Sequence, residues 1–252
     1  MCIALLAKDM FPDYPLAIAH NRDEFYLRDS SYAKWWDTPH ILAGKDDQSG
    51  GTWFGVRDDG FFAFVTNYRN PELFNADLDS RGQLLLRILE HTGSMKNLEA
   101  SLAKIARDYN HFNVVCGSHS EQWFFSSRAL NMDPISHTAC VSNADFDTPW
   151  PKAERLKRLV GEIDQNSFDL THDLLSIMKD DRLAGEYELP RTGISKEQEL
   201  ALSPIFIETK LYGTRTTTVL LFRTDGSFHF TEVNYAHPGQ LASRNSFDVR
   251  VN

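Results

Sequence analysis

The sequence contains few cysteines, no long apolar run and too little positive charge for a typical nucleic-acid-binding protein. Its three cysteines, Cys2, Cys116 and Cys140, cannot all pair with one another and show no C-x-x-C spacing. We therefore expect no disulfide framework, no cysteine-based metal site and no covalent haem attachment. The 26 Lys and Arg residues are outnumbered by 35 Asp and Glu residues, which gives a net charge of −9. This sign disfavours nucleic acid and anionic membrane surfaces as partners.

The N-terminus also lacks the features of a targeting signal. The stretch MCIALLAKDM has no positively charged start, and its apolar run stops at Lys8. No run of about 20 apolar residues follows, so we expect no integral membrane segment. These absences predict a soluble, cytoplasmic protein.

What the sequence does contain is the ordinary composition of a globular protein. Of its 252 residues, 42% are hydrophobic and 24% are charged, which argues against disorder and coiled coil as the main architecture. A chain of this length buries roughly 70–75% of its unfolded surface. No repeat or low-complexity block divides it, so we predict one domain spanning residues 1–252.

The hydrophobic periodicity changes several times along the chain. Short β-branched and aromatic runs predict strands at 2–7, 16–20, 40–44, 52–56, 61–66, 112–116, 122–126, 205–208, 214–222 and 227–233. Helical spacing predicts helices at 80–92, 94–108, 149–163 and 171–178. The dipeptides Asp59-Gly60 and Asp225-Gly226 predict tight hairpin turns. Because strands and helices are segregated into blocks, we predict an α+β fold, a four-layer αββα sandwich of two stacked antiparallel sheets with helices outside.

Cys2 is the most informative single residue. If Met1 is removed, Cys2 carries both a thiol and a free α-amine. An α-amine titrates near about 8, so it can take the thiol proton directly or through a water, and one residue then supplies nucleophile and base. The alternative is that Cys2 is a small apolar residue at the start of a buried strand.

A polar cluster, His20-Asn21-Arg22-Asp23-Glu24, directly follows the apolar run 16–19. Because side chains alternate along a strand, Asn21 and Asp23 share one face, whereas His20, Arg22 and Glu24 share the other. Asp23 is suited to hold an α-ammonium beside Cys2 if the first two strands pair. The alternative is a strand-end turn with a surface ion pair between Arg22 and Glu24, which contributes little to stability.

Two asparagines and one arginine stand at other strand ends. Asn67, followed by Tyr68, ends a strongly apolar strand, and Asn143 follows the short run 138–141. A side-chain amide in such a place can donate to a developing oxyanion, although turn capping is the more common role. Arg215 opens a later strand, where its guanidinium can hold a carboxylate or a polarised carbonyl, or can face solvent.

Taken together, these segments resemble the NRDE family, also called the transport and Golgi organisation protein 2 family. The resemblance covers nearly the whole chain and rests on the order and spacing of Met1-Cys2, Asn21-Arg22-Asp23-Glu24, Gly51-Thr52-Trp53, Thr66-Asn67-Tyr68-Arg69, Ser142-Asn143-Ala144, Thr148-Pro149-Trp150-Pro151 and Gly213-Thr214-Arg215. That family in turn looks like the N-terminal-nucleophile (Ntn) hydrolases of the choloylglycine hydrolase and penicillin acylase type.

The resemblance implies the αββα sandwich and assigns roles to particular residues. It implies Cys2 as the nucleophile, Asp23 and Arg215 as further catalytic residues, and Asn143 as an oxyanion donor. The candidates for substrate binding are Asn21, Arg22, Glu24, Asn67, Tyr68 and Trp53. In one respect the chain departs from the hydrolases, which usually carry an arginine three residues before the aspartate. That position here is His20.

Two functions are open from the sequence. The first is a cysteine amidohydrolase or acyltransferase that acts on a small non-peptide amide or acyl substrate and needs no cofactor. The second is a non-catalytic carrier of haem, or of a lipid or acyl-CoA, in the same pocket, since the family resemblance also implies haem trafficking and lipid metabolism. For the haem iron, His20 is the nearest axial candidate. An interaction protein at organelle membranes is least favoured, because the charge is acidic.

Overall fold

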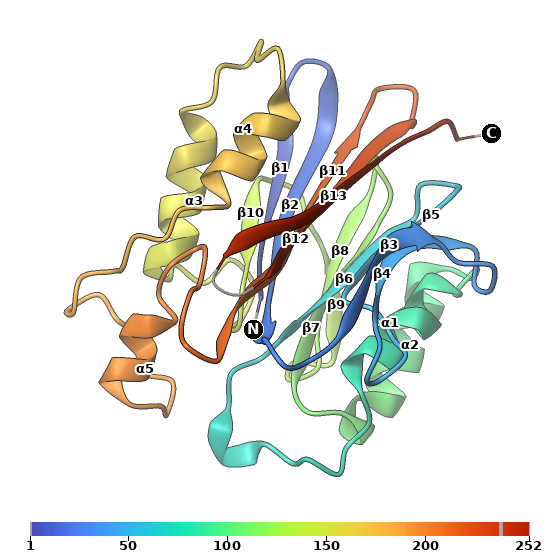
Figure 1. Cartoon of the computed structure of the whole chain (residues 1–252). Coiled ribbons are helices and arrows are strands. Elements are labelled where there is room, and N and C mark those ends of the chain that lie inside the picture. Colours follow the sequence, from blue (N-terminus) through green and yellow to red (C-terminus); the bar gives the residue numbers. More distant parts are fainter. Residues whose placement is uncertain (1, 237–238, 252) are drawn as a thin grey trace.

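The computed structural model describes residues 2–236 and 239–251, which form two antiparallel sheets stacked face to face. The first sheet has the order β10-β1-β2-β11-β12-β13, and the second runs from β3 to β9 in chain order. Figure 1 shows α3 and α4 on the outer side of the first sheet and α1 and α2 beside the second. The predicted four-layer αββα sandwich is therefore confirmed.

The strands of the first sheet come from both ends of the chain. They are β1 (Cys2–Phe11), β2 (Tyr14–Phe25), β10 (Ala139–Val141), β11 (Tyr212–Phe222), β12 (Phe228–Ala236) and β13 (Gln240–Val249). The second sheet uses the middle of the chain: β3 (Ser30–Trp35), β4 (Ile41–Asp46), β5 (Phe54–Arg57), β6 (Phe62–Asn67), β7 (Phe112–Gly117), β8 (Gln122–Ser126) and β9 (Asn131–Pro134).

The helices begin where side chains can satisfy their first backbone N–H groups. Ser80 accepts from the Gly82 N–H at the start of α1 (Arg81–Leu89), and Ser94 accepts from the Asn97 N–H at the start of α2 (Met95–Ile105). The helix α3 (Pro151–Gly161) begins with proline, which has no N–H to lose. The remaining helices are α4 (Leu170–Ile177), α5 (Lys196–Ala201) and the short 3-10 turns η1 (Pro71–Leu73) and η2 (Ala106–Asp108). None of the helices within the described ranges is long and apolar enough to cross a membrane.

Three apolar layers hold the sandwich together. The side chains of β1 alternate, so Leu5 packs outward under α3 and α4, whereas Leu6 packs between the sheets with Phe54. The third layer joins α1 and α2 to the second sheet, with Leu84 and Ile88 fully buried there. Burying one such side chain contributes roughly 1.5–3 kcal/mol, so these layers supply the main driving force for folding.

Two predicted hairpins are present as expected. In the first, Arg57 N–H donates to the Phe61 carbonyl at 2.8 Å, and Gly60 has a φ of +81°. In the second, Arg223 N–H donates to the Ser227 carbonyl at 2.8 Å, and Gly226 also has a φ of +81°. Glycine adopts this left-handed backbone without the steric cost that other residues incur.

The strand prediction was wrong in several places. Residues 205–208 form no strand; Phe206 N–H instead donates to the Asp180 carbonyl and Ile207 N–H to the Thr214 hydroxyl. The strands β3, β9 and β13 were missed because their side chains are largely polar or exposed, so the apolar period is weak there. The helix α5 was missed because its six residues are too few to show a helical period.

Candidate active site

Cys2 is the first residue of β1 and lies directly opposite Arg22 on β2. Directly paired residues of an antiparallel ladder point to the same side of the sheet. The side chains of Cys2 and Arg22 therefore both belong to the face that looks toward the second sheet. Cys2 is 7% exposed and lines a cavity of about 290 Å³.

The cavity gathers polar side chains from six separate segments of the chain. They come from β1, from β2 and the turn after it, from the end of β4 and the segment before β5, from the end of β6, from the residues before α1 and its start, and from Asn110 before β7. The polar and aromatic lining residues include Cys2, Arg22, Asp23, Glu24, Arg28, Asp46, Thr52, Trp53, Asn67, Asp79 and Arg81. Of the residues predicted from the sequence, Cys2, Arg22, Asp23, Glu24, Trp53 and Asn67 thus share one cavity.

Arg22 is fixed on one edge of its guanidinium. Its Nη2 donates to Asp46 Oδ2 at 3.0 Å, and the guanidinium lies 4.3 Å from the centre of the Trp53 ring. Asp46 is itself held by Arg28 Nε at 2.6 Å and by the Ser49 N–H at 3.0 Å. Arg22 Nη1 is buried and has no hydrogen-bond partner within the described part of the chain. Arg22 therefore brings a positioned charge and an unused donor to the cavity.

The surroundings of the Cys2 thiol have opposing effects on its pKa. Burial raises the pKa above its usual value of 9.0. The charge of Arg22 and a hydrogen bond from the backbone of Asp23 oppose this rise, because both favour the thiolate. Because the net shift is upward, the sulfur is mostly protonated at neutral pH and needs a base to become a nucleophile.

Asp23 lies on the side of β2 that faces away from Arg22, as the alternation predicts. Its Oδ1 accepts from the Thr214 hydroxyl at 2.7 Å, and its backbone carbonyl accepts from the Tyr212 hydroxyl at 2.8 Å. Burial raises the pKa of the Asp23 carboxyl, while the charge of Lys152 and the Thr214 hydrogen bond lower it. The hydrogen bond from Thr214 therefore holds the Asp23 carboxyl in place within the interior, next to Cys2.

Asn143 directly follows Ser142, a residue that is hydrogen-bonded to Cys2. The Ser142 hydroxyl donates to the Cys2 carbonyl at 3.1 Å, and Asn143 Nδ2 donates to the Asn67 carbonyl at 2.8 Å. An amide nitrogen carries two hydrogens, so Asn143 Nδ2 can also donate to a second acceptor. Asn143 lines a groove of about 470 Å³ that adjoins the Cys2 cavity, and Asn67 lines both.

Arg215 does not reach the cavity, which corrects its predicted role as a catalytic residue. Its Nη1 donates to three backbone carbonyls, those of Phe25, Tyr26 and Arg28, at 3.2, 2.8 and 3.2 Å. These bonds fix the turn that follows β2. Arg215 thus stabilises the segment that presents Glu24 and Arg28 rather than holding a substrate.

Asn21 also lies outside the cavity, contrary to its predicted role in substrate binding, whereas Tyr68 lies outside the cavity but lines the adjoining groove. Asn21 is fully buried on the outer face of the sheet, where Nδ2 donates to the carbonyls of Met178 and Ile205, each at 2.9 Å. It therefore ties the sheet to the helical layer. The Tyr68 hydroxyl accepts from Arg128, and its ring lines the adjoining groove.

His20 is enclosed by aromatic rings between the two sheets. Its ring lies 5.7 Å from Phe54 and 5.4 Å from Phe64, and its exposure is 0%. Burial, together with the charge of Arg22, lowers the pKa of His20 to about 3. This position corrects the expectation that His20 is an accessible axial ligand for haem, because a ligand could reach it only by opening the core.

Arg81 was not predicted from the sequence, although it lines both the cavity and the adjoining groove. It is the first residue of α1, and the start of this helix is pressed against the segment before β5. A Cβ atom on Gly51 would lie 2.2 Å from the Gly82 carbonyl carbon, so only glycine permits this approach. The two glycines Gly51 and Gly82 are the signal of this close approach that the sequence offers.

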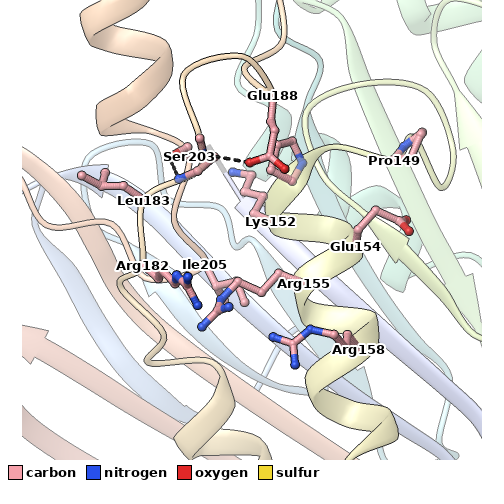
Figure 2. Close-up of a pocket in the computed structure, with 13 residues that line it drawn as sticks. Pro149, Lys152, Glu154, Arg155, Arg158, Arg182, Leu183, Glu188, Ser203 and Ile205 are labelled. Carbon is pink, nitrogen blue, oxygen red and sulfur yellow. Dashed lines mark hydrogen bonds between the residues drawn. The ribbon is translucent and has the colours of Figure 1, made fainter.

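A larger cleft of about 870 Å³ lies between α3 and the segment 182–205, and Figure 2 shows residues that line it. Lys152 is 3% exposed at its floor, and its Nζ has no hydrogen-bond partner among the residues described. Burial lowers the pKa of Lys152 to about 8, with the charge of Asp23 acting in the opposite direction. Arg155, by contrast, is paired with Asp180. The candidate active site is the smaller cavity, because Cys2 lines that one.

Three comparisons relate the chain to known proteins. Residues 1–237 match the family model described as Transport and Golgi organisation 2. The human Transport and Golgi organization protein 2 homolog is 33% identical, and the cattle (Bos taurus) homolog is 32% identical, each alignment covering 92% of both chains. The Drosophila melanogaster Transport and Golgi organization protein 2 is 26% identical, over 92% of this chain and 91% of the relative.

Among solved structures, the chain resembles the C2A mutant of conjugated bile acid hydrolase from Clostridium perfringens. The TM-score is 0.47 at 11% identity, covering 98% of this chain and 92% of the other. A second resemblance is to the Caenorhabditis elegans ortholog of N-acylethanolamine-hydrolyzing acid amidase. Its TM-score is 0.44 at 9% identity, covering 87% of this chain and 92% of the other.

Proposed function

The chain belongs to the Transport and Golgi organisation 2 family, and we propose that it is a cysteine amidohydrolase that cleaves the carbon–nitrogen bond of a small non-peptide amide. The observation that carries this proposal is the meeting of Cys2, Arg22, Asp23 and Asn67 at one cavity. A thiol, a fixed cation, a buried carboxyl and an amide from three strands form the set that acyl transfer requires.

The first step is activation of the thiol. We propose that Met1, which lies outside the described residues, is removed, so that Cys2 gains a free α-amine. An α-amine titrates near about 8 and is partly unprotonated at neutral pH, so it can accept the thiol proton. Asp23, the neighbour of Arg22 on β2, then holds the resulting α-ammonium through its carboxylate. Arg22 favours the thiolate by its charge.

The thiolate next attacks the amide carbonyl carbon. A carbon–sulfur bond forms, and the electron pair of the carbonyl double bond moves to its oxygen. Asn143 Nδ2 and backbone N–H groups are the candidate donors that stabilise this oxyanion. When the oxyanion collapses, the carbon–nitrogen bond breaks, and the leaving amine takes the proton from the α-ammonium of Cys2. Water then cleaves the thioester, releasing a carboxylic acid and restoring the thiol.

A carrier of an acyl ligand is the second candidate, and the adjoining groove favours it. The groove is larger than the Cys2 cavity, and it is lined by Phe25, Tyr68, Leu73 and Phe74. A carrier would bind its ligand whether or not Cys2 is present. Haem as the ligand has less support, because His20 is enclosed in the core.

Release of primary amine from a panel of small amides separates the two candidates. Cys2→Ala is expected to abolish release while leaving the melting temperature nearly unchanged. Cys116→Ala is the matched control, because Cys116 is a buried thiol on β7 outside the cavity. If the Cys2→Ala protein releases amine at the wild-type rate, the hydrolase proposal is wrong. If neither protein releases amine but both bind acyl ligands equally, the carrier proposal takes its place.

A further inference from the structure

The Cys2 cavity and the adjoining groove share part of their lining. Both are lined by Asn67, Phe74, Arg81 and Asn110. The cavity has a volume of about 290 Å³ and the groove one of about 470 Å³. A molecule of modest size can therefore lie across Asn67 with one half in each.

The cavity half is built to receive an anion. Arg22 is 4% exposed, and its Nη1 lacks a hydrogen-bond partner among the residues described. A buried guanidinium donor left without an acceptor is costly, so the site favours a ligand that supplies one. Arg81 lines the same cavity, and the one hydrogen bond described for its guanidinium is a long one, 3.4 Å, to the His111 carbonyl. Two arginine groups are thus available to one acceptor.

The acidic side chains of the lining limit the negative charge that a ligand can carry. Arg22 and Arg28 both donate to Asp46, so two cations share one carboxylate there. Glu24 and Asp79 also line the cavity, and their carboxylates would repel a doubly charged group such as phosphate. A carboxylate, which arginine can bind through two parallel hydrogen bonds, fits this limit.

The groove half presents apolar side chains to solvent. Phe25 is 58% exposed, and Leu73 and Phe74 are each 63% exposed. Large apolar side chains that are exposed together beside a cavity are typical of a binding site. Asn143, the candidate oxyanion donor, also lines the groove and donates to the carbonyl of Asn67, which lines both halves.

We propose that the ligand of this site is an amphipathic amide with a carboxylate on one side of the amide bond and an apolar group on the other. Arg22 and Arg81 bind the carboxylate, and Leu73 and Phe74 cover the apolar group. This inference rests on the proposed function for the position of the amide at Cys2. It adds Arg81 and the groove residues as determinants of specificity.

Binding to the Cys2→Ala protein, measured by calorimetry, tests the carboxylate without turnover. The probes are N-decanoylglycine and N-decylsuccinamic acid, which carry the carboxylate on opposite sides of the amide, and the uncharged primary amide of each. We expect at least one acid to bind about tenfold or more tightly than its uncharged partner, as a charge-assisted hydrogen bond provides. Equal binding of acid and uncharged amide in both pairs overturns the proposal.

Two pairs of variants locate the determinants. Arg81→Met is expected to remove most of the preference for the acid, whereas Arg87→Met, at an exposed position on the same helix, keeps it. Leu73→Ser is expected to weaken the decanoyl probe but not N-acetylglycine. Its control is Leu241→Ser, at a position 65% exposed on β13. An unchanged preference in Arg81→Met contradicts the anion site.

The two proposals fail in different ways. If the wild-type protein hydrolyses amides with no preference for a carboxylate, the hydrolase proposal stands and the anion site is wrong. If acids bind through Arg81 but are not hydrolysed by the wild-type protein, the anion site stands and the hydrolase proposal is wrong.

Discussion

Cys2 and Arg22 lie directly opposite each other on β1 and β2, and both line the same cavity. The guanidinium is fixed from behind by Asp46 and stacks on Trp53. The charge directly opposite Cys2 on the neighbouring strand is thus positive and held in place.

Replacing Arg22 by methionine should make the Cys2 thiol less acidic. The charge of Arg22 lowers the pKa of this thiol, although burial keeps the pKa above 9.0 overall. Without that charge the pKa rises, so the pH at which alkylation accelerates moves further upward. The measurement is the iodoacetamide reaction rate at Cys2 from pH 7 to 10, followed by peptide mass. Arg87→Met should leave the profile in place, and an unchanged profile in Arg22→Met refutes the electrostatic role.

Asn21→Leu should destabilise the fold without altering the thiol. The substitution removes the donor to the buried carbonyls of Met178 and Ile205. Leaving a buried acceptor unsatisfied costs about 1–3 kcal/mol, so the free energy of unfolding in urea should fall by about 2 kcal/mol or more. The alkylation profile of Cys2 should stay as in the wild type. A stable variant with impaired ligand binding would instead return Asn21 to the substrate site.

Glu232 should make stability decrease as the pH rises toward neutrality. It is buried at 1% exposure between the sheets, and burial raises its pKa from 4.5 to about 7. The folded protein therefore binds this proton more tightly than the unfolded chain. The resulting stabilisation is complete below pH 4.5 and is lost as the pH rises through about 7.

The Glu232→Gln variant isolates this contribution. Glutamine keeps an oxygen that can accept from the Ala33 N–H, which donates to Glu232 Oε1 at 2.7 Å. The stability difference, wild type minus variant, should fall between pH 4.5 and 7 by an amount on the order of 3 kcal/mol. Urea unfolding at several pH values measures it. A difference that does not change with pH contradicts the raised pKa.

Lys152→Met should stabilise the protein at neutral pH. The Lys152 ammonium is buried, and burial lowers its pKa from 10.5 to about 8. The unfolded chain therefore binds this proton more tightly, so the wild type gains stability as the pH rises from about 8 to 10.5. The variant should lack that gain and have a higher melting temperature at pH 7. A lower melting temperature would mean that the attraction between Lys152 and Asp23 outweighs the cost of burial.

The parts of the fold that local sequence determines could be predicted. The amphipathic spacing of Leu84, Leu85 and Ile88 identified α1, and the glycines at 60 and 226 identified two hairpins. Each of these signals comes from residues that lie close together in the sequence. The edge strand β13 escaped because its alternation is polar and exposed, and its pairing depends on β12 alone.

The site was predictable only in part, for the same reason. Because β1 and β2 form a hairpin, the proximity of Cys2 to the cluster that contains Asp23 follows from local pairing. Arg81 reaches the cavity through the packing of α1 on Gly51, a contact between distant segments that periodicity does not encode. The position of Arg215 at the start of a strand indicated a site residue, yet its guanidinium donates to backbone carbonyls instead.

Trapping the acyl-enzyme tests the central claim most directly. Wild-type protein is incubated with the amide probe that it turns over, quenched in acid and mapped by peptide mass. We expect a chain that begins at Cys2, because Met1 has been removed, and that carries the acyl group of the probe on the Cys2 sulfur. Two results would contradict this expectation. One is release of amine by a protein that retains Met1, and the other is a burst of product with no acyl adduct at Cys2.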